Sequence, residues 1–363
     1  MDKMYVEDCC EILDSMRVPI TSSDREKGKY PYYGANGIQD YIADYIFDDE
    51  LVLLAEDGGN FGSKERPIAY RVSGKCWVNN HAHVLKPKEG LNVDYLCYSL
   101  MFYKVDGMIN GATRQKLTQS AMCKMQIPIR SIEEQKYIVD ELNRIIKIKE
   151  QREKEKELLD QLIKARFVEM FGDCDDMVSI SDLCSIITDG THQSPKFQES
   201  GIPFILVSNL SNNTVTYNTE KYISEETYNE LYKRTPIEKG DLLLSTVGSY
   251  GHPAVVTENT RFLFQRHIAY LKPKREVVNS FYLHSALLAP DGQRQIEEKV
   301  KGIAQKTLNL SEIRTIRIPV PEIEEQNAFE DFVNQVTKSK VVVQKALDEA
   351  QLLFDSLMQE YFG

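Results

Sequence analysis

Two stretches of the chain, GATRQKLTQSAMCKMQIPIRSIEEQ (residues 111–135) and GIAQKTLNLSEIRTIRIPVPEIEEQ (residues 302–326), align without a gap at an offset of 191 residues. The register continues through the segment that follows, so that Phe171-Gly172 meets Phe362-Gly363 at the end of the sequence. The alternative is a chance alignment of two unrelated Glu-rich helices. A period of about 190 residues is too long for a solenoid unit, so the pattern predicts a duplicated module and an internal pseudo-twofold repeat.

The last part of each module is expected to be one long helix. Residues 131–172 and 322–363 begin with Glu-Glu pairs, which favour the positive end of the helix dipole. Apolar residues close to heptad spacing predict that the two helices pair as an antiparallel coiled coil. The alternative is that each helix folds back on its own domain. The apolar positions are Ile138, Leu142, Ile145, Leu159, Leu162 and Ile163 in the first helix and Phe329, Val333, Val336, Val343, Ala350, Leu353 and Leu357 in the second.

The part of each module before the helix is expected to be rich in β-strands. Short apolar runs such as LVLLAEDGGNFG and KGDLLLSTVGSYG alternate with Gly, Asn and Asp turn signals. The two parts resemble each other loosely, with His81 and Lys86-Pro87 corresponding to His267 and Lys272-Pro273. We therefore expect an α+β fold. Its two β-rich domains would be separated by the two long antiparallel coiled-coil helices, and the expected segments in chain order are 1–130, 131–172, 173–321 and 322–363.

The composition argues against several classes of protein. Hydrophobic residues make up 42% and charged residues 27% of the 363 residues, and no apolar run approaches the ~18 residues that a bilayer helix needs. Seven cysteines without a CxxC pair indicate thiols in a reducing compartment. The first residues, MDKMYVEDCC, are acidic where a signal peptide is basic and apolar. We expect a cytoplasmic protein with no membrane partner and no cofactor.

The net charge of −11 conceals two basic strips. Residues 110–130 carry +4 and residues 301–321 carry +3, whereas all other segments are acidic. The overall acidity argues against non-specific coating of nucleic acid. The strips lie at equivalent places in the repeat, and their Arg and Lys side chains could neutralise phosphates locally.

Motifs for catalysis are missing or weak. There is no Asn or Asp followed by Pro-Pro and an aromatic residue, no GxGxxG and no GxxxxGK[ST]. The glycine-rich GGNFG is expected to be a loop between strands. Asp291 with Glu297 and Lys299 resembles a nuclease motif, but QRQIEEKV is typical of a charged helix face. His81 and His83 alternate on an expected strand without an evident third ligand, so we predict no metal site and no catalytic residue.

The order of the segments resembles that of the specificity subunits of type I restriction-modification systems. This order is a β-rich domain, a basic strip ending in IPI or IPVP, a long helix starting with EEQ, and then the same again. Family-like details are YYG with GI within 32–38 and DGTH with GIPF within 189–204. The resemblance covers the whole chain, and the paired strips are its most specific motif.

This resemblance implies a non-catalytic subunit that recognises double-stranded DNA. The two β-rich domains would be target recognition domains, each reading one half of a bipartite asymmetric sequence. The helices would be conserved spacer regions that fix the gap between half-sites and dock two methyltransferase subunits, with nuclease-translocase subunits joining them. The target base would be flipped into the methyltransferase, so this chain would supply contacts but no chemistry.

The DNA contacts are predicted by residue type, because Arg and Lys neutralise phosphates and side-chain amides and Arg suit base edges. For the strips the alternative is salt bridging to the acidic helices, and for each loop residue it is a solvated loop. The candidates in the first module are Asn60, Lys64, Arg66, Asn79, Asn80, His81, Arg114, Gln115 and Lys116. Those in the second module are Thr191, His192, Ser194, Lys196, Asn209, Ser249, Tyr250, His252, Gln265, Arg266, Gln305 and Lys306.

Other hypotheses stay open. The net charge of −11 predicts that the isolated chain binds DNA weakly and that only a complex binds tightly. A second class of function is a coiled-coil scaffold whose β-rich domains bind proteins; removal of the charge of the strips would then leave function intact. A nuclease that uses Glu297 and Lys299 would show metal-dependent cleavage by the chain alone.

Overall fold

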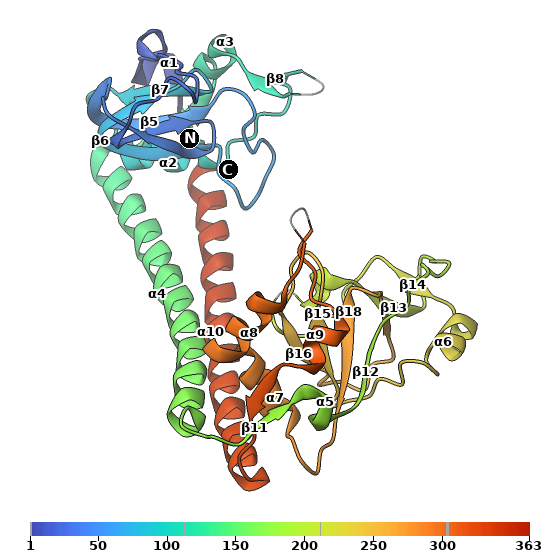
Figure 1. The fold of residues 1–363 in the computed structure, drawn as a ribbon. Helices are drawn as coiled ribbons and strands as arrows, with labels where there is room; N and C mark the ends of the chain where they lie inside the picture. Colours follow the sequence, from blue (N-terminus) through green and yellow to red (C-terminus); the bar gives the residue numbers. More distant parts are fainter. Residues whose placement is uncertain (1, 112–113, 211, 303–304) are drawn as a thin grey trace. The chain divides into compact units, whose positions relative to one another are not determined.

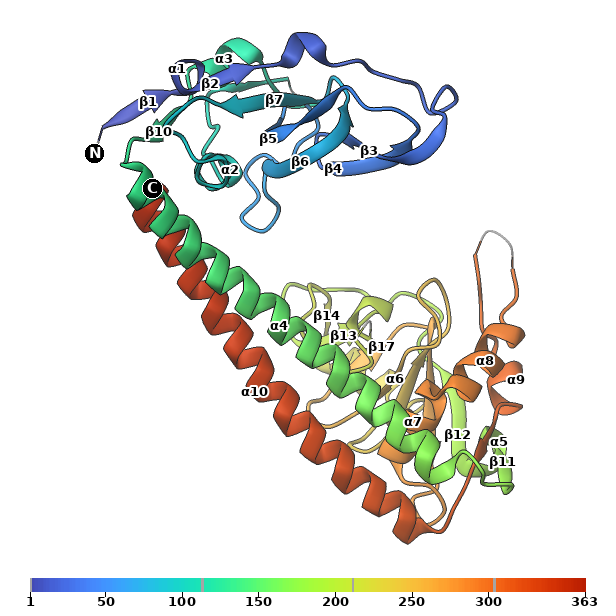
Figure 2. The same cartoon turned by 90° about the vertical axis from the view of Figure 1, so that its left-hand side faces the viewer.

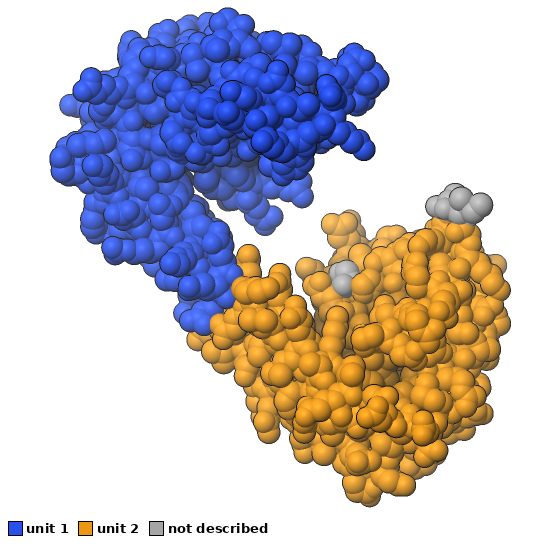
Figure 3. All heavy atoms as spheres, turned by 60° about the vertical axis from the view of Figure 1, so that its left-hand side comes forward, with its two compact units in different colours: residues 1–152, 346–363 blue, residues 153–345 orange. Residues whose placement is uncertain are grey.

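The computed structural model describes residues 2–111, 114–210, 212–302 and 305–363. These residues form two compact units, which Figure 3 colours separately. Unit 1 comprises residues 1–152 and 346–363, and unit 2 comprises residues 153–345. Each unit holds one β-rich domain and a part of both long helices, so the boundaries expected between domains and helices stay a prediction.

Unit 1 is built on a six-stranded sheet of order β2-β7-β5-β6-β3-β4 (Figure 2). The central strand β5 (Phe47–Ala55) is buried on both faces: Val52 and Leu54 belong to one core cluster, and Leu51 and Leu53 to another. The other elements are β1 (Lys3–Tyr5), α1 (Val6–Cys9), β2 (Cys10–Ile12), η1 (Asp14–Met16), β3 (Lys27–Gly34), β4 (Gly37–Ile42), β6 (Ala69–Val78), β7 (Ala82–Pro87), α2 (Val93–Met101), β8 (Ile109–Asn110), β9 (Lys116–Leu117), α3 (Gln119–Cys123) and β10 (Gln126–Pro128).

Unit 2 divides its strands between a four-stranded sheet, β12-β18-β15-β16, and a three-stranded sheet, β14-β13-β17. Its central strand β15 (Leu242–Ser245) is also buried throughout. The other elements are β11 (Met177–Ser179), α5 (Ile180–Leu183), β12 (Cys184–Asp189), β13 (Ile202–Ile205), η2 (Val207–Leu210), β14 (Tyr222–Ile223), α6 (Glu225–Leu231), β16 (Pro253–Val255), β17 (Leu263–Phe264), β18 (Ile268–Pro273), α7 (Ser280–Leu288), α8 (Pro290–Lys299), α9 (Leu310–Arg314) and β19 (Arg317–Pro319).

The register of the strands confirms the repeat. In unit 1, β5 lies between β7 and β6, and Leu54 pairs with His83; in unit 2, β15 lies between β18 and β16, and Leu244 pairs with Ala269. The end of each basic strip also forms the same structure twice. Strand β10 pairs antiparallel with β1, and β19 pairs antiparallel with β11. Each strip therefore closes its β-rich domain by pairing with the first strand of that domain.

The long helices α4 (Ile132–Phe171) and α10 (Ile323–Phe362) lie side by side (Figures 1 and 2). Lys149 contacts Gln351 in unit 1, whereas in unit 2 Lys156 donates to Gln344 at 2.7 Å and Lys340 pairs with Asp160 at 2.6 Å. The helices are antiparallel, because the residue number of the partner falls as that in α4 rises. The expected α+β fold with an antiparallel helix pair is confirmed. Among the described residues, no helix is long and apolar enough to cross a membrane.

The helix seam departs from the expected heptads at two positions. Leu162 and Leu353 are exposed to 46% and 51%, so the expectation that they face inward was wrong. The α-helix repeats every 3.6 residues rather than 3.5, so a fixed heptad assignment drifts around the helix over 40 residues. Larger aromatic side chains, Phe167 and Phe354, are buried instead. The expected positions that are buried are Ile138, Leu142, Ile145, Phe329, Val333, Val336 and Val343.

The last aromatic residue of each module packs against the β-rich domain of the other module. Phe171, at the end of α4, has its ring 4.9 Å from that of Tyr282 in unit 2. Phe362, at the end of α10, has its ring 5.2 Å from that of Tyr95 in unit 1. Neither helix therefore folds back on its own domain, and the repeated Phe-Gly pair is explained by packing.

Candidate nucleic-acid interface

The first basic strip carries cations that are already paired. Arg114 Nη2 lies 2.8 Å from Asp57 Oδ1, and Lys116 Nζ lies 2.9 Å from Glu56 Oε1. Both carboxylates follow directly after β5, so the partners come from the domain of unit 1 and not from the acidic helices. Arg114 and Lys116 remain 59% and 48% exposed, and exposed ion pairs of this kind contribute little to stability. A phosphate could therefore compete for both cations at small cost.

The second basic strip repeats this arrangement with different residues. Lys306 Nζ lies 2.8 Å from Glu297 Oε1 and donates to the hydroxyl of Tyr250 at 3.1 Å, and that hydroxyl contacts Glu297 as well. Hydrogen bonds from Lys306 and Tyr250 hold the pKa of Glu297 below its usual range. Glu297 lies on α8, where Asp291 is held by Arg294. The nuclease-like string is thus a paired, helical surface.

Backbone hydrogen bonds tie the first strip to a two-residue turn, Asn80-His81, that precedes β7. Glu56 N donates to His81 O at 2.9 Å, and Leu117 N donates to Glu56 O at 2.7 Å. Asp57 adds a side-chain link, because His81 Nδ1 and Arg114 Nη2 lie 2.7 and 2.8 Å from the same carboxylate oxygen. The turn and the strip are held together as one surface.

The same backbone bonds recur in unit 2. The turn before β18 is Arg266-His267. Thr246 N donates to His267 O at 2.9 Å, and Leu308 N donates to Thr246 O at 2.8 Å. Both domains therefore place an exposed turn residue beside a basic strip through identical main-chain connections, although the side chains differ.

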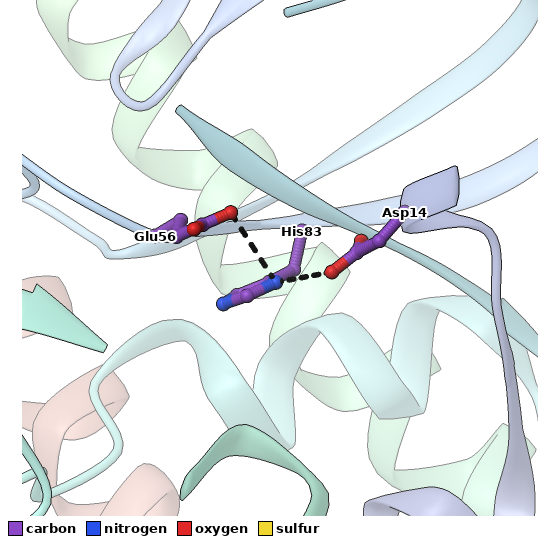
Figure 4. Close-up of side chains that lie close together, drawn as sticks. All are labelled: Asp14, Glu56 and His83. Carbon is purple, nitrogen blue, oxygen red and sulfur yellow. Dashed lines mark hydrogen bonds and ion pairs between the residues drawn. The ribbon is translucent and has the colours of Figure 1, made fainter. Parts of the chain in front are cut away.

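Beneath the first strip lies a buried ionic cluster of Asp14, Glu56 and His83 (Figure 4). His83 is fully buried; its Nδ1 lies 2.6 Å from Asp14 Oδ2 and its Nε2 2.9 Å from the carbonyl of Leu117. Burial would raise the pKa of the Asp14 carboxyl, but the hydrogen bonds from His83 and the Val84 amide, with the charges of His83 and Arg17, together lower it. The cluster fixes β9 of the strip on the sheet.

The ligand geometry of this cluster does not suit a metal ion. The carbonyl of Leu117 can only accept, so His83 Nε2 must carry a proton, and Nδ1 already faces Asp14. Arg17 Nη1 occupies Glu56 Oε2 at 2.6 Å. The expectation that His81 shares a strand with His83 was wrong, because His81 lies in the turn before β7 and pairs with Asp57.

At the equivalent place, unit 2 has an open cavity of about 450 Å³. Arg266 and His267 line it from the turn, and Thr307 lines it from the strip. Ala269 stands at the position in β18 that corresponds to the buried His83 of β7. A second cavity of about 290 Å³ lies beside Thr191 and His192. Asp189 orders its rim, with His192 Nε2 at 2.8 Å and Arg234 Nη2 at 2.7 Å.

Two of the predicted contact residues have local structural roles. Asn79 is 3% exposed, and its amide donates to Gln39 at 3.1 Å and accepts from the amide of His81 at 2.8 Å. Asn209 is 8% exposed, and its amide donates to the carbonyls of Thr216 and Asn218. Their side chains have few groups left for DNA, so we leave them out of the interface proposed below.

The remaining candidates lie in loops and turns, except Lys116, which begins β9. The exposed ones are Lys64, Arg66, Asn80, Arg114, Gln115, Lys116, His192, Ser194, Lys196, Ser249, Arg266, Gln305 and Lys306, and those of intermediate exposure are Asn60, His81, Thr191, Tyr250, His252 and Gln265. His252 Nδ1 lies 3.0 Å from Asn213 Oδ1. Sequence reasoning missed Asp57, and it considered Glu297 only as part of a nuclease-like motif and not as the partner of Lys306. Asp57 lies 57 residues before Arg114, so no local pattern could reveal that pair.

These features define a class of protein: a duplicated α+β chain with two β-rich domains, each carrying a basic strip, and an antiparallel helix pair. The family model described as the type I restriction modification DNA specificity domain matches residues 1–160 and 175–350. The chain belongs to this family of type I restriction-modification specificity subunits.

Similar proteins agree with this assignment. A Haemophilus influenzae protein assigned as a type I restriction enzyme specificity subunit is 26% identical over 353 residues, which cover 92% of this chain and 88% of the relative. The EcoBI specificity subunit of Escherichia coli is 29% identical over 161 residues, covering 44% and 34%. The fold matches the S subunit of M. genitalium with a TM-score of 0.56 at 14% identity, covering 100% of this chain and 96% of that one.

Proposed function

We propose that this chain is the non-catalytic subunit that gives a type I restriction-modification complex its DNA sequence specificity, in the cytoplasm. Each β-rich domain, residues 1–130 and 173–321, reads one half of a bipartite asymmetric site on double-stranded DNA. The helices, residues 131–172 and 322–363, dock two methyltransferase subunits, and nuclease-translocase subunits join that complex.

The observation that carries this proposal is the surface that both domains share. In each unit a basic strip is tied by main-chain hydrogen bonds to an exposed polar turn. Arg and Lys on the strips position DNA through its phosphates, and the turns and loops present the side chains that read bases. The paired carboxylates Asp57 and Glu297 weaken binding by the free chain, in agreement with its net charge of −11.

Docking of partner proteins is supported by apolar side chains that the helix pair leaves exposed. In unit 2, Leu158 and Leu162 of α4 are 51% and 46% exposed, and Val341 and Val342 of α10 are 65% and 68% exposed. Exposed groups of large apolar residues mark interaction sites. We infer a second docking place in unit 1 from the internal repeat, where Leu353 corresponds to Leu162 and is also exposed.

Purification of the tagged chain from the organism that encodes it tests this function. We expect two copies of a DNA methyltransferase per chain, and a complex that protects one bipartite sequence from nuclease digestion while the chain alone protects none. A complex without a methyltransferase, or one that protects no defined sequence, would contradict the proposal. Metal-dependent cleavage of DNA by the purified chain would contradict its non-catalytic role.

A further inference from the structure

The paired turns Asn80-His81 and Arg266-His267 have the same structure but differ in their first residue. In both turns the first residue is exposed and the histidine is half-buried, and a strand that ends in Lys-Pro follows. The preceding residues are held alike: Asn79 N donates to Tyr33 O at 3.0 Å, and Gln265 N donates to Ile205 O at 3.3 Å. Because the backbone is shared, a difference at the exposed position changes what the turn presents and leaves its fold unchanged.

We propose that the first residue of these paired turns is a base-reading position, with Asn80 reading an adenine in one half-site and Arg266 reading a guanine in the other. This inference rests on the proposed function and assigns a specificity-determining residue to each domain. Asn is suited to the N6 and N7 edge of adenine, and Arg to the O6 and N7 edge of guanine, each through two hydrogen bonds.

The guanidinium of Arg266 is held in an orientation that suits two parallel hydrogen bonds. Its Nε donates to His267 Nε2 at 3.2 Å, which leaves the Nη1 and Nη2 edge available. Burial, with the charge of Arg266, lowers the pKa of His267, so the imidazole is neutral and Nε2 can accept. Within the described residues, no carboxylate forms an ion pair with Arg266, unlike Arg114 and Arg234.

Asn80 is the counterpart of Arg266 in unit 1. Its side chain is exposed and has no hydrogen bond to any described residue, whereas the amide of its neighbour Asn79 is used within the domain. Both edges of the Asn80 amide are therefore free for a base. Of the two adjacent asparagines, Asn79 therefore has a structural role and Asn80 is the reading position.

Each reading position lies beside cations that would hold the phosphates. In unit 1 the guanidinium of Arg114 lies 3.4 Å from Nδ1 of His81, and His81 is the residue that follows Asn80. In unit 2 Arg266 lines the same cavity as Thr307, which follows Lys306. A nucleotide whose base edge reaches the turn would thus have its phosphate next to the basic strip.

Replacement of the chromosomal gene by variants, followed by sequencing that detects methylated bases, tests the assignment. We expect Arg266→Gln to abolish the requirement for guanine at one position of one half-site, with the other half-site unchanged. Methylation of the original motif should fall about tenfold or more. Asn80→Arg should change an adenine to a guanine in the other half-site only. Arg266→Lys keeps the charge but loses the paired hydrogen bonds, so it should relax the same position as Arg266→Gln.

The matched control is Arg275→Gln, because Arg275 is an exposed arginine beyond the opposite end of β18. It should leave the motif unchanged. A wild-type gene that restores no motif to a deletion strain would refute the proposed function. A restored wild-type motif that Arg266→Gln and Asn80→Arg both leave unchanged would overturn only the reading positions. The reading positions would also be overturned if Arg266→Gln abolished methylation while Arg266→Lys kept methylation of the original motif. The positive charge alone would then explain the effect of Arg266 on methylation.

Discussion

The buried side chain of Gln326 accepts a hydrogen bond at Oε1 from the backbone amide of Asn279, at 2.9 Å. Its Nε2 donates to the carbonyls of Val277 and Pro321, at 3.1 and 2.8 Å. Asn279 itself caps α7. The glutamine of the EEQ sequence thus locks the start of the long helix to the β-rich domain, and Gln135 makes the same contact with Asn92 in unit 1.

Replacement of this glutamine should loosen unit 2. Gln326 is fully buried, and Gln326→Leu removes the side-chain partner of three backbone groups. A buried group left unsatisfied costs about 1–3 kcal/mol. We expect the free energy of unfolding to fall by about 2–5 kcal/mol, seen as a lower urea midpoint by circular dichroism. Glu324→Gln, on the exposed side of the same turn, is the control. Equal midpoints for the two variants would refute the locking role.

The buried pair of Asp14 and His83 should make unit 1 sensitive to acid. The folded-state pKa of Asp14 is lowered, so its stabilising effect is present above its unfolded pKa of about 3.9 and is lost as the pH falls through the folded pKa. Asp14→Asn should unfold more easily at pH 7, by about 3–5 kcal/mol, because it leaves His83 without its charged partner. Its stability should also fall less steeply below pH 4.

Urea titrations at several pH values measure both effects. Asp106→Asn, at an exposed position, controls for the loss of one carboxylate. If the Asp14→Asn curve runs parallel to that of the wild type below pH 4, the Asp14 carboxylate is not the acid-sensitive group.

The basic strips should set the salt dependence of DNA binding. Arg114→Gln and Lys306→Gln should each lower the slope of log affinity against log salt by about 0.9, irrespective of sequence, since each removes one phosphate contact. Asp57→Asn should act in the opposite sense and strengthen binding at low salt, because Arg114 is no longer held at 2.8 Å by a carboxylate. Filter binding of the purified complex at several salt concentrations measures these effects, with Lys154→Gln on α4 as the control.

Phe171, at the end of α4, should contribute more to stability than the exposed residues of the same helix turn. Phe171 is 2% exposed, with its ring 4.9 Å from Tyr282 and 5.6 Å from Phe329. Phe171→Ala should lower the free energy of unfolding by about 3–5 kcal/mol, whereas Val168→Ala, at a residue 48% exposed, should change it by less than about 1 kcal/mol. Similar thermal midpoints for the two variants would contradict this packing.

The repeat, the strips and the long helices could be predicted from sequence because each has a local pattern. The ungapped match that ends at Phe362-Gly363 predicted the two modules, and the Glu-Glu pairs predicted where the long helices begin. The seam was less predictable. Leu162 and Phe167 are both apolar, and packing against Tyr282 of α7 and Phe329 of α10 buries only Phe167.

The interface was predictable in composition but not in its pairing. Arg114 and Lys306 were found as charges in the basic strips, yet the carboxylates that hold them come from the loop after β5 and from α8. The buried cluster was not predicted either, because only the pairing of β2 with β7 brings Asp14 into contact with His83. Long-range pairing of strands leaves no local signal in a single sequence.

The most direct test of the central claim is to sequence the DNA of the organism by a method that detects methylated bases, with and without this gene. We predict that a single bipartite motif, two short specific halves separated by unspecified bases, loses its methylation on deletion and regains it when the gene is restored. Unchanged methylation at every motif, in cells whose partner methyltransferase is expressed and active, would contradict the account.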